Sequence, residues 1–241
     1  MPKFFLDSAP GETALLDGED GRHIARSLRM RPGEALTLCD CRGTDYDGVI
    51  DTIDGESVTV RILGSRPCAA EPSLSAVLYQ CLPKLDKFDL VVQKSVELGV
   101  SRIVPVLSIR CVSRPDAKSL AKKLERWNRI AAEAAKQSGR GILPPVSPAL
   151  PFEQAVREAE SAGGVNLLFY EGGGVPIRER IGEATRTASL FIGPEGGFDK
   201  SEVELAAAHG ITPATLGPRI LRTETAPLAA LAAIMTVSGN M

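Results

Sequence analysis

The sequence predicts an α/β protein in two parts, a small N-terminal β-barrel over residues 1–68 and a parallel-sheet domain over residues 73–241. Two observations predict this division. Up to about residue 65, short runs of alternating apolar and polar residues are separated by glycine and aspartate turns, which is typical of small β domains. From residue 73 onward, apolar strand-like runs alternate with helical segments, which is typical of βα units and a parallel sheet.

The N-terminal part is expected to carry one helix among its strands. In one of these strands Val58, Val60 and Ile62 alternate with polar residues, so they are expected to share one face. The helix is expected from about residue 20 to residue 30, because acidic residues stand at its start and arginines toward its end, as the helix dipole favours. Residues 64–72 have the composition of a linker and end this part.

The second part is expected to contain five parallel strands, separated for the most part by helices. The strands are expected over residues 74–82, 102–107, 165–170, 188–192 and 214–216. The longest helix is expected over residues 116–138 and the last over residues 226–237. The last helix is apolar on every side, so we expect it to be buried on every side, against the core and in part against a second subunit.

Composition favours a well-cored globular protein, with 44% hydrophobic residues in a chain of 241. No run approaches the roughly 18 apolar residues that cross a membrane, and the N-terminus is too soon acidic for a signal peptide, so a cytoplasmic protein is expected. The five scattered cysteines argue against a disulfide framework. Cys39 and Cys41 form only a Cys-x-Cys pair, with neither His23 nor His209 at zinc-ligand spacing, so no metal site is expected.

The net charge of −2 conceals two basic regions. Residues 22–31 carry four arginines and no acidic residue, and residues 110–140 carry nine basic and three acidic side chains. Such regions steer a protein toward phosphate backbones, although solvated helix faces would give the same pattern.

Two glycine-bearing loops stand near the C-terminus, Gly-Pro-Glu-Gly-Gly at residues 193–197 and Leu-Gly-Pro-Arg-Ile-Leu-Arg-Thr-Glu-Thr-Ala at residues 216–226. Each follows a strand-like run and precedes a helical segment, so both are expected at the carboxyl edge of one sheet, where open α/β folds bind ligands. Neither loop has the Gly-x-x-x-x-Gly-Lys-Ser/Thr pattern of a triphosphate site. For residues 193–197 alone, an ordinary turn into the next helix is an equal alternative.

The second loop contains a cation that helix capping does not explain. Thr223 or Thr225, followed by Pro227, predicts the start of a helix. A cation such as Arg222 is unfavourable just before a helix N-terminus unless it faces an anionic partner. Arg222 is therefore a candidate functional residue.

With three further segments in the same order, these loops resemble the SPOUT class of S-adenosylmethionine-dependent RNA methyltransferases, and more narrowly the 16S ribosomal RNA uridine-N3 methyltransferases (ribosomal small-subunit methyltransferase E). The further segments are residues 23–33, 93–100 and 133–140, and the resemblance covers essentially the whole chain. It implies a PUA-like fold for the barrel and a deep trefoil knot in the C-terminal sheet domain, a rare exception to unknotted topology. It also implies a homodimer that acts on ribosomal RNA, within the small ribosomal subunit.

The resemblance places S-adenosylmethionine in a pocket formed by the knot loops and the end of the strand over residues 165–170. The implied cofactor-binding residues are Leu168, Phe169, Gly193, Pro194, Glu195, Gly196, Gly197, Leu216, Gly217, Ile220, Leu221, Arg222, Thr223, Thr225 and Ala226. The glycines let backbone groups approach the cofactor closely, and the leucines and isoleucine supply apolar walls.

The implied reaction assigns catalytic roles to Arg222 and Glu224. Uridine N3 must lose its proton and attack the sulfonium methyl, so the negative charge that develops on the base requires stabilisation. Arg222 suits that role, because a guanidinium stays charged, and for the same reason it cannot be the base. Glu224 could accept the proton or orient Arg222, and both roles remain open.

Target RNA is expected to contact basic and polar side chains on three helices. They are His23, Arg26 and Arg29 on the N-terminal helix, Lys87 and Lys94 on the first helix of the second part, and Gln137 and Arg140 beside Glu133 on the long helix. Solvated, salt-bridged surfaces are the alternative for each group.

Three rival functions share some of these features. Residues 169–174 superficially resemble the glycine loop of a Rossmann-type methyltransferase, but only about 70 residues follow, too few for a doubly wound sheet. Another SPOUT enzyme, methylating a ribose 2′-oxygen or a transfer RNA base, would share the pocket. A non-catalytic RNA-binding assembly factor would not bind S-adenosylmethionine, which calorimetry would reveal.

Overall fold

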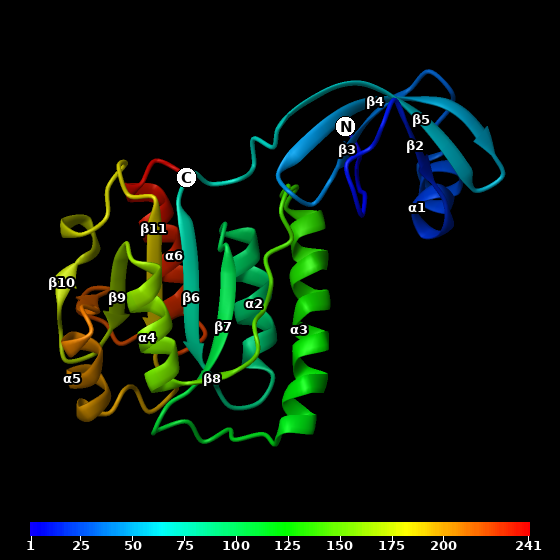
Figure 1. Ribbon diagram of the computed structural model, residues 1–241. Helices are drawn as coiled ribbons and strands as arrows, with labels where there is room; N and C mark the ends of the chain where they lie inside the picture. The colour runs from blue at the N-terminus through cyan, green and yellow to red at the C-terminus, as the bar shows by residue number, and fades with distance from the viewer. The chain divides into compact units, whose positions relative to one another are not determined.

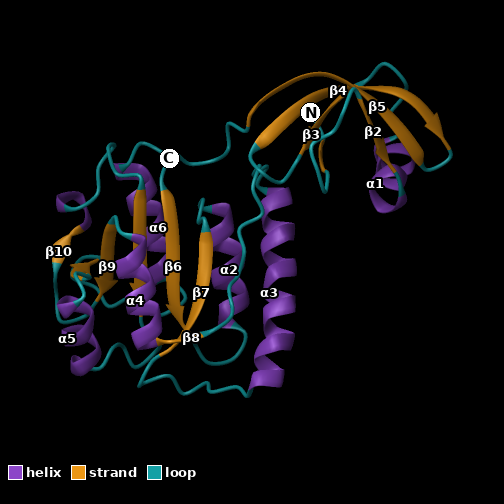
Figure 2. Cartoon of the chain, in the orientation of Figure 1, coloured by secondary structure: helices purple, strands orange, loops and turns teal.

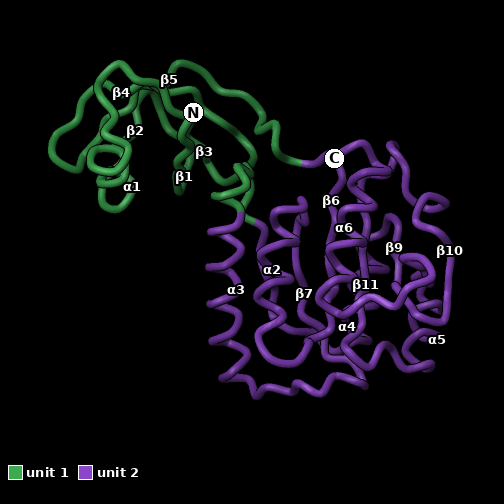
Figure 3. Tube along the Cα trace, turned by 180° about the vertical axis from the view of Figure 1, so that it is seen from behind, with its two compact units in different colours: residues 1–71, 135–143 green, residues 72–134, 144–241 purple.

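The structure is a computed structural model that describes all residues from 1 to 241. The chain forms two compact units, coloured separately in Figure 3. Unit 1 contains residues 1–71 and 135–143, and unit 2 contains residues 72–134 and 144–241. The membership of residues 135–143 in unit 1 was not anticipated from the sequence. No helix combines the length and the apolar character that crossing a membrane requires.

Unit 1 is built on a five-stranded sheet in the order β1-β3-β4-β5-β2. Figure 2 shows the strands in orange. Its strands are β1 (Lys3–Phe5), β2 (Thr13–Leu16), β3 (Ala35–Cys39), β4 (Thr44–Asp54) and β5 (Ser57–Pro67). Neighbouring strands are antiparallel except β1 and β3, which are parallel. The predicted alternation in β5 is confirmed, because Val58 and Val60 are fully buried and Ile62 packs against the same core. The expected linker is wrong in part, since residues 64–67 continue β5 and pair with β4.

The helix expected in unit 1 is of two kinds. Helix α1 (Gly18–Arg22) leads directly into a π-helix, His23–Leu28, after which Arg29 adopts a left-handed conformation with φ 52°. A π-helix closes its hydrogen bonds over five residues rather than four. The spacing of His23, Arg26 and Arg29 therefore does not align them on one regular helical face, although all three side chains are exposed.

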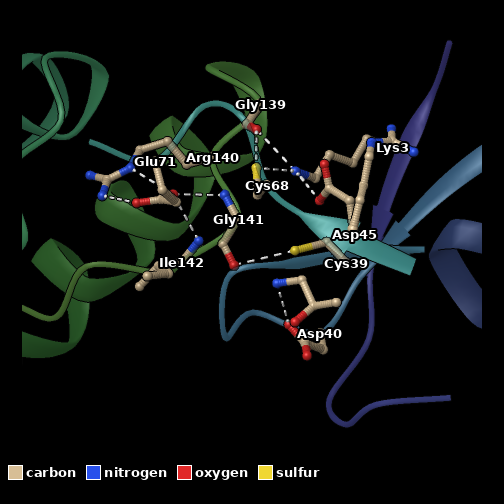
Figure 4. A network of polar contacts seen from close by, with 12 residues as sticks. Lys3, Cys39, Asp40, Asp45, Cys68, Glu71, Gly139, Arg140, Gly141 and Ile142 are labelled. Carbon is tan, nitrogen blue, oxygen red and sulfur yellow. Dashed lines mark hydrogen bonds and ion pairs between the residues drawn. The ribbon is translucent and has the colours of Figure 1, made fainter. Parts of the chain in front are cut away.

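A polar network within unit 1 holds the segment 135–143 in place (Figure 4). The carboxylate of Glu71 accepts hydrogen bonds from the Arg140 guanidinium (Nη2–Oε2 2.7 Å) and from the backbone N–H of Gly141 (2.7 Å). Lys3 Nζ donates to the Gly139 carbonyl at 3.0 Å, and the Cys39 thiol donates to the Gly141 carbonyl at 3.3 Å. These bonds satisfy the backbone of a short loop and explain why it belongs to unit 1.

Unit 2 contains a seven-stranded sheet in the order β10-β12-β9-β11-β6-β7-β8, in which every neighbouring pair is parallel. The strands are β6 (Ser75–Cys81), β7 (Arg102–Leu107), β8 (Leu150–Pro151), β9 (Val165–Phe169), β10 (Val175–Pro176), β11 (Thr187–Ile192) and β12 (Thr212–Thr215). The five expected strands and their parallel arrangement are confirmed. The two-residue strands β8 and β10 at the sheet edges were not expected, because they are too short to show an apolar pattern.

Helices cover both faces of this sheet (Figure 1), with α4 in front of it and α2 and α6 behind. The helices are α2 (Lys87–Glu97), α3 (Ala117–Gln137), α4 (Phe152–Ala162), α5 (Lys200–Ala208) and α6 (Ala226–Val237), with a 3-10 turn over Ile177–Glu179. Only one side of α6 is buried in the single chain, and it includes Leu231 and Ile234. Its other side, which includes Leu228 and Ala232, is half-buried. A single chain therefore does not bury α6 on every side, as the sequence had led us to expect.

Candidate active site

A cavity of about 800 Å³ lies where β9, β11 and β12 end. Its walls are formed mainly by residues 169–173, 192–195 and 215–224. The carboxyl ends of parallel strands meet at one edge of a sheet, so loops distant in sequence converge there. The prediction that the two glycine-bearing loops share one sheet edge is confirmed.

The hydroxyl of Thr223 joins the two loops. It donates a hydrogen bond to the Gly193 carbonyl at 2.8 Å and accepts one from Gln80 Nε2 at 3.1 Å. Thr223 is 6% exposed and Gln80 is fully buried at the end of β6. The Thr223 side chain therefore forms part of the pocket wall. It does not cap a helix, which was one of the two possibilities that the sequence offered.

The first loop is also fixed from outside the pocket. Asp199 and Glu202 form a capping box at the start of α5, and buried Glu202 additionally accepts a bond from the Ile109 N–H at 2.8 Å. The guanidinium of Arg110 donates to the Gly196 carbonyl at 3.0 Å and pairs with Asp199 at 3.1 Å. The loop over residues 193–197 therefore both leads into α5 and forms part of the pocket wall, so the two alternatives offered by the sequence are both correct.

Two of the pocket glycines require their lack of a side chain. Gly217 has φ +100°, a conformation that other residues rarely adopt. Gly197 has φ +66°, and a Cβ atom there would lie 3.0 Å from a carboxylate oxygen of Glu171. The first loop therefore passes close to the loop that follows β9.

Charged groups from three segments meet at the pocket. Lys87 Nζ, at the start of α2, lies 3.0 Å from Glu224 Oε2 and 3.5 Å from Glu195 Oε1. The hydrogen bond to Glu224 raises the pKa of Lys87. Burial alone would raise the pKa of Glu224, but its own backbone N–H and Lys87 outweigh burial and lower it. Glu224 is therefore held as an anion and is a weak proton acceptor.

Arg222 lines the same pocket, its side chain is exposed, and it makes no ion pair or side-chain hydrogen bond. Its carbonyl accepts the N–H groups of Thr225 (2.8 Å) and Ala226 (2.9 Å), which fixes its backbone at the turn before α6. Thr225 occupies the N-cap position of α6, but its hydroxyl makes no capping bond. The guanidinium of Arg222 is consequently available to a ligand.

Most of the expected cofactor-binding residues line the cavity, but Leu168, Gly196 and Thr225 do not. Leu168 is fully buried within β9, because its side chain points into the sheet packing rather than beyond the strand end. Lys87 and residues 171–173 also line the cavity, although the sequence did not indicate them as pocket residues. The glycines after Tyr170 were a usable signal, since they permit a tight loop directly after a strand.

The expected RNA contacts differ in their availability. Arg140 is 3% exposed and bonded to Glu71, so it is not a free phosphate-binding group. Lys94 pairs with Glu97 at 2.9 Å, and Lys87 faces the pocket. Gln137 remains exposed, as do the three residues of unit 1, of which Arg26 pairs with Glu56 at 2.8 Å.

Two protein-family models match successive parts of the chain. The RNA methyltransferase domain family matches residues 70–235, and the RNA methyltransferase PUA domain family matches residues 16–63. Ribosomal RNA small subunit methyltransferase E of Bacillus subtilis is 34% identical over 97% of this chain and 93% of its own length. The Aquifex aeolicus protein of the same name is 35% identical over 98% and 99%.

Solved structures with a bound cofactor are similar over the whole chain. Ribosomal RNA small subunit methyltransferase E from Neisseria gonorrhoeae, bound to S-adenosyl methionine, is 35% identical with a TM-score of 0.83, covering 98% of this chain and 97% of that one. A methyltransferase from Legionella pneumophila with bound SAM is 33% identical with a TM-score of 0.80, covering 97% and 96%. The chain therefore belongs to the ribosomal RNA small subunit methyltransferase E family of RNA methyltransferases.

Proposed function

We propose that the protein transfers a methyl group from S-adenosylmethionine to N3 of a specific uridine in 16S ribosomal RNA of the small ribosomal subunit. Family membership and similarity to structures with the bound cofactor support the reaction class. The observation that carries the proposal is the unpaired guanidinium of Arg222 in the wall of a pocket built from backbone loops. Its substrate places the protein in the cytoplasm.

The residues of the pocket fit S-adenosylmethionine. The cavity volume of about 800 Å³ lies within the range of roughly 300–1,000 Å³ that is usual for small-molecule sites. Leu216 and Leu221 offer apolar walls for an adenine ring, and the loop glycines expose backbone donors and acceptors. The carboxylate of Glu171 lies in the wall, where it suits a cationic group of the cofactor. When bound, the cofactor supplies the electrophilic methyl group.

Arg222 and Glu224 act differently in this proposal. Loss of the N3 proton leaves negative charge on the uracil ring, and the Arg222 guanidinium donates hydrogen bonds to its oxygens. Glu224 has a lowered pKa and is bonded to Lys87, so we do not assign it to proton abstraction.

The decisive experiment maps modified nucleotides in ribosomal RNA from cells that lack the protein. The loss of one 3-methyluridine is expected, and an unchanged modification pattern would refute the proposal. With purified protein, Arg222→Ala is expected to keep S-adenosylmethionine binding by calorimetry and to lose most turnover, because charge stabilisation is removed while the pocket walls remain. Normal turnover in that variant would overturn the role of Arg222.

We further propose a homodimer formed through α6 and a trefoil knot in the C-terminal domain. The half-buried apolar side of α6 supports the dimer, because a surface of this kind calls for a partner. Sedimentation is expected to give the mass of two chains, and Ala232→Glu to give the mass of one, whereas Ala207→Glu on the exposed side of α5 leaves the dimer intact. An experimental chain trace through residues 165–226 tests the knot.

We propose that unit 1 contributes to RNA binding through the exposed side chains of its helical segment. His23, Arg26 and Arg29 are all exposed there. Guanidinium groups on a solvent-exposed surface suit phosphate contacts that position the RNA without reading its sequence.

A further inference from the structure

Lys87 occupies a position that its local structure disfavours. It is the first residue of α2, an eleven-residue helix, where the helix dipole is unfavourable for a cation. Two carboxylates compensate for this, Glu224 at 3.0 Å and Glu195 at 3.5 Å. Glu195 is held in turn by the backbone N–H of Lys84 at 3.0 Å. Lys87 therefore connects α2 with both loops of the pocket.

Besides Lys87, Arg222 is the cation whose charge acts on the Glu224 carboxylate. The two residues are separated by one position in the same loop, both line the cavity, and the positive charge of Arg222 contributes to the lowered pKa of Glu224. Nevertheless, the carboxylate bonds to Lys87 and the guanidinium stays unpaired. An Arg–carboxylate bond is favourable and can be bidentate, so it would form readily if Glu224 were released.

We propose that Lys87 is a positioning residue for methyl transfer, which holds Glu224 and thereby keeps the Arg222 guanidinium free for the uracil oxygens. This inference rests on the function proposed above. Lys87 itself does not contact the reacting atoms. Its role differs from that of a phosphate contact, because Lys87 acts by holding Glu224, which would otherwise compete with the uracil for Arg222.

A double-mutant experiment tests the proposal. Lys87→Met keeps most of the aliphatic stem and removes the charge, so Glu224 is free to bond Arg222, and we expect turnover to fall about tenfold, the factor that corresponds to one hydrogen bond between charged groups. Adding Glu224→Gln removes the competing charge. The double variant is therefore expected to recover about fivefold or more over Lys87→Met.

Matched controls make the recovery specific. Lys200→Met removes an exposed lysine that pairs with Glu204 on α5, and it leaves turnover unchanged. Adding Glu204→Gln to Lys87→Met gives no recovery, because Glu204 does not face the pocket. Lys87→Arg retains a cation at the same place and keeps turnover well above that of Lys87→Met. Turnover in the Lys87→Met/Glu224→Gln variant at or below that of Lys87→Met overturns the proposal.

A structural readout is independent of activity. A crystal structure of Lys87→Met without substrate is expected to show the Arg222 guanidinium bonded to Glu224, and the wild type to show it unpaired. An unpaired Arg222 in the variant overturns the proposal. If the wild-type protein formed no 3-methyluridine, the proposed function would fail, and this structural comparison would still decide whether Lys87 controls the Arg222–Glu224 contact.

Discussion

Replacing Thr223 by valine removes one hydroxyl and keeps the shape of the side chain. That hydroxyl donates to the Gly193 carbonyl at 2.8 Å and accepts from Gln80 Nε2 at 3.1 Å, so it joins the two loops that form the pocket. Gln80 keeps its second bond to the Cys81 carbonyl at 3.0 Å, whereas the Gly193 carbonyl loses the partner that the hydroxyl provided. The change therefore removes the bonds that join the loops within the cavity wall.

The expected cost follows from these two bonds. At about 1 kcal/mol for each net hydrogen bond, Thr223→Val destabilises the junction by about 2 kcal/mol. If the loops separate in the free protein, the same energy must be recovered when the cofactor orders them, and the Kd for S-adenosylmethionine rises by up to about 30-fold. If they stay together, the cost is observed in the free energy of unfolding instead.

Calorimetry with S-adenosylmethionine and urea unfolding of the same samples separate these outcomes. Thr223→Ser retains the hydroxyl and is expected to stay close to the wild type in both measurements. Ser161→Ala, at an exposed position of α4, removes a hydroxyl that bonds only its own helix, and it is expected to change neither. Wild-type affinity together with wild-type stability in Thr223→Val would refute the view that this hydroxyl holds the pocket together.

Three further predictions concern other parts of the molecule. Glu71→Ala leaves the guanidinium of buried Arg140 without its anion and should lower the free energy of unfolding in urea by about 3 kcal/mol. Glu153→Ala, in an exposed pair with Arg157, should lower it by less than about 1 kcal/mol. Equal effects of the two changes would contradict the burial argument. Arg26→Ala should weaken RNA binding and reduce the slope of log affinity against log salt by about 1, and an unchanged slope would exclude a phosphate contact. The pKa of Glu224 lies below its usual 4.5, so the bonds that its carboxylate accepts from its own backbone N–H and from Lys87 stabilise the fold above about that pH and are lost as pH falls through the lowered pKa. Acid unfolding of Glu224→Gln, followed by circular dichroism, should lack this step.

The five longer strands of unit 2 and its last helix were predictable from local patterns. An apolar run such as that of β7 is buried between two layers of helices, and its limits, Arg102–Leu107, agree with the prediction because no polar alternation obscures them. The limits of α6 agree as well, since Pro227 and an uninterrupted apolar run define a helix start and body. Both glycine-bearing loops were expected at the same sheet edge for the same local reasons.

The ion pair of Arg140 with Glu71 could not be predicted from helical spacing. The long helix ends at Gln137, and Gly139 adopts φ +74°, so the chain turns before Arg140 and directs it to Glu71, distant in sequence. Spacing of three or four residues predicts a shared face only while the helix continues. The same spacing does not predict a shared face for residues 23–29, because the hydrogen bonds of the π-helix after α1 span five residues instead of the four of an α-helix.

Lys87 and Arg222 show how far an electrostatic argument from sequence extends. Each is a cation near the start of a helix, and in each case the helix dipole calls for an anionic partner. From the sequence, only Arg222 is expected to face an anionic ligand, whereas Lys87 is expected to share an RNA-binding face with Lys94. In the structure Lys87 has its partners within the chain, Glu224 and Glu195, and Arg222 has none. A cation near the start of a helix thus predicts a nearby anion. Only the tertiary contacts show whether that anion belongs to the protein or to a bound substrate.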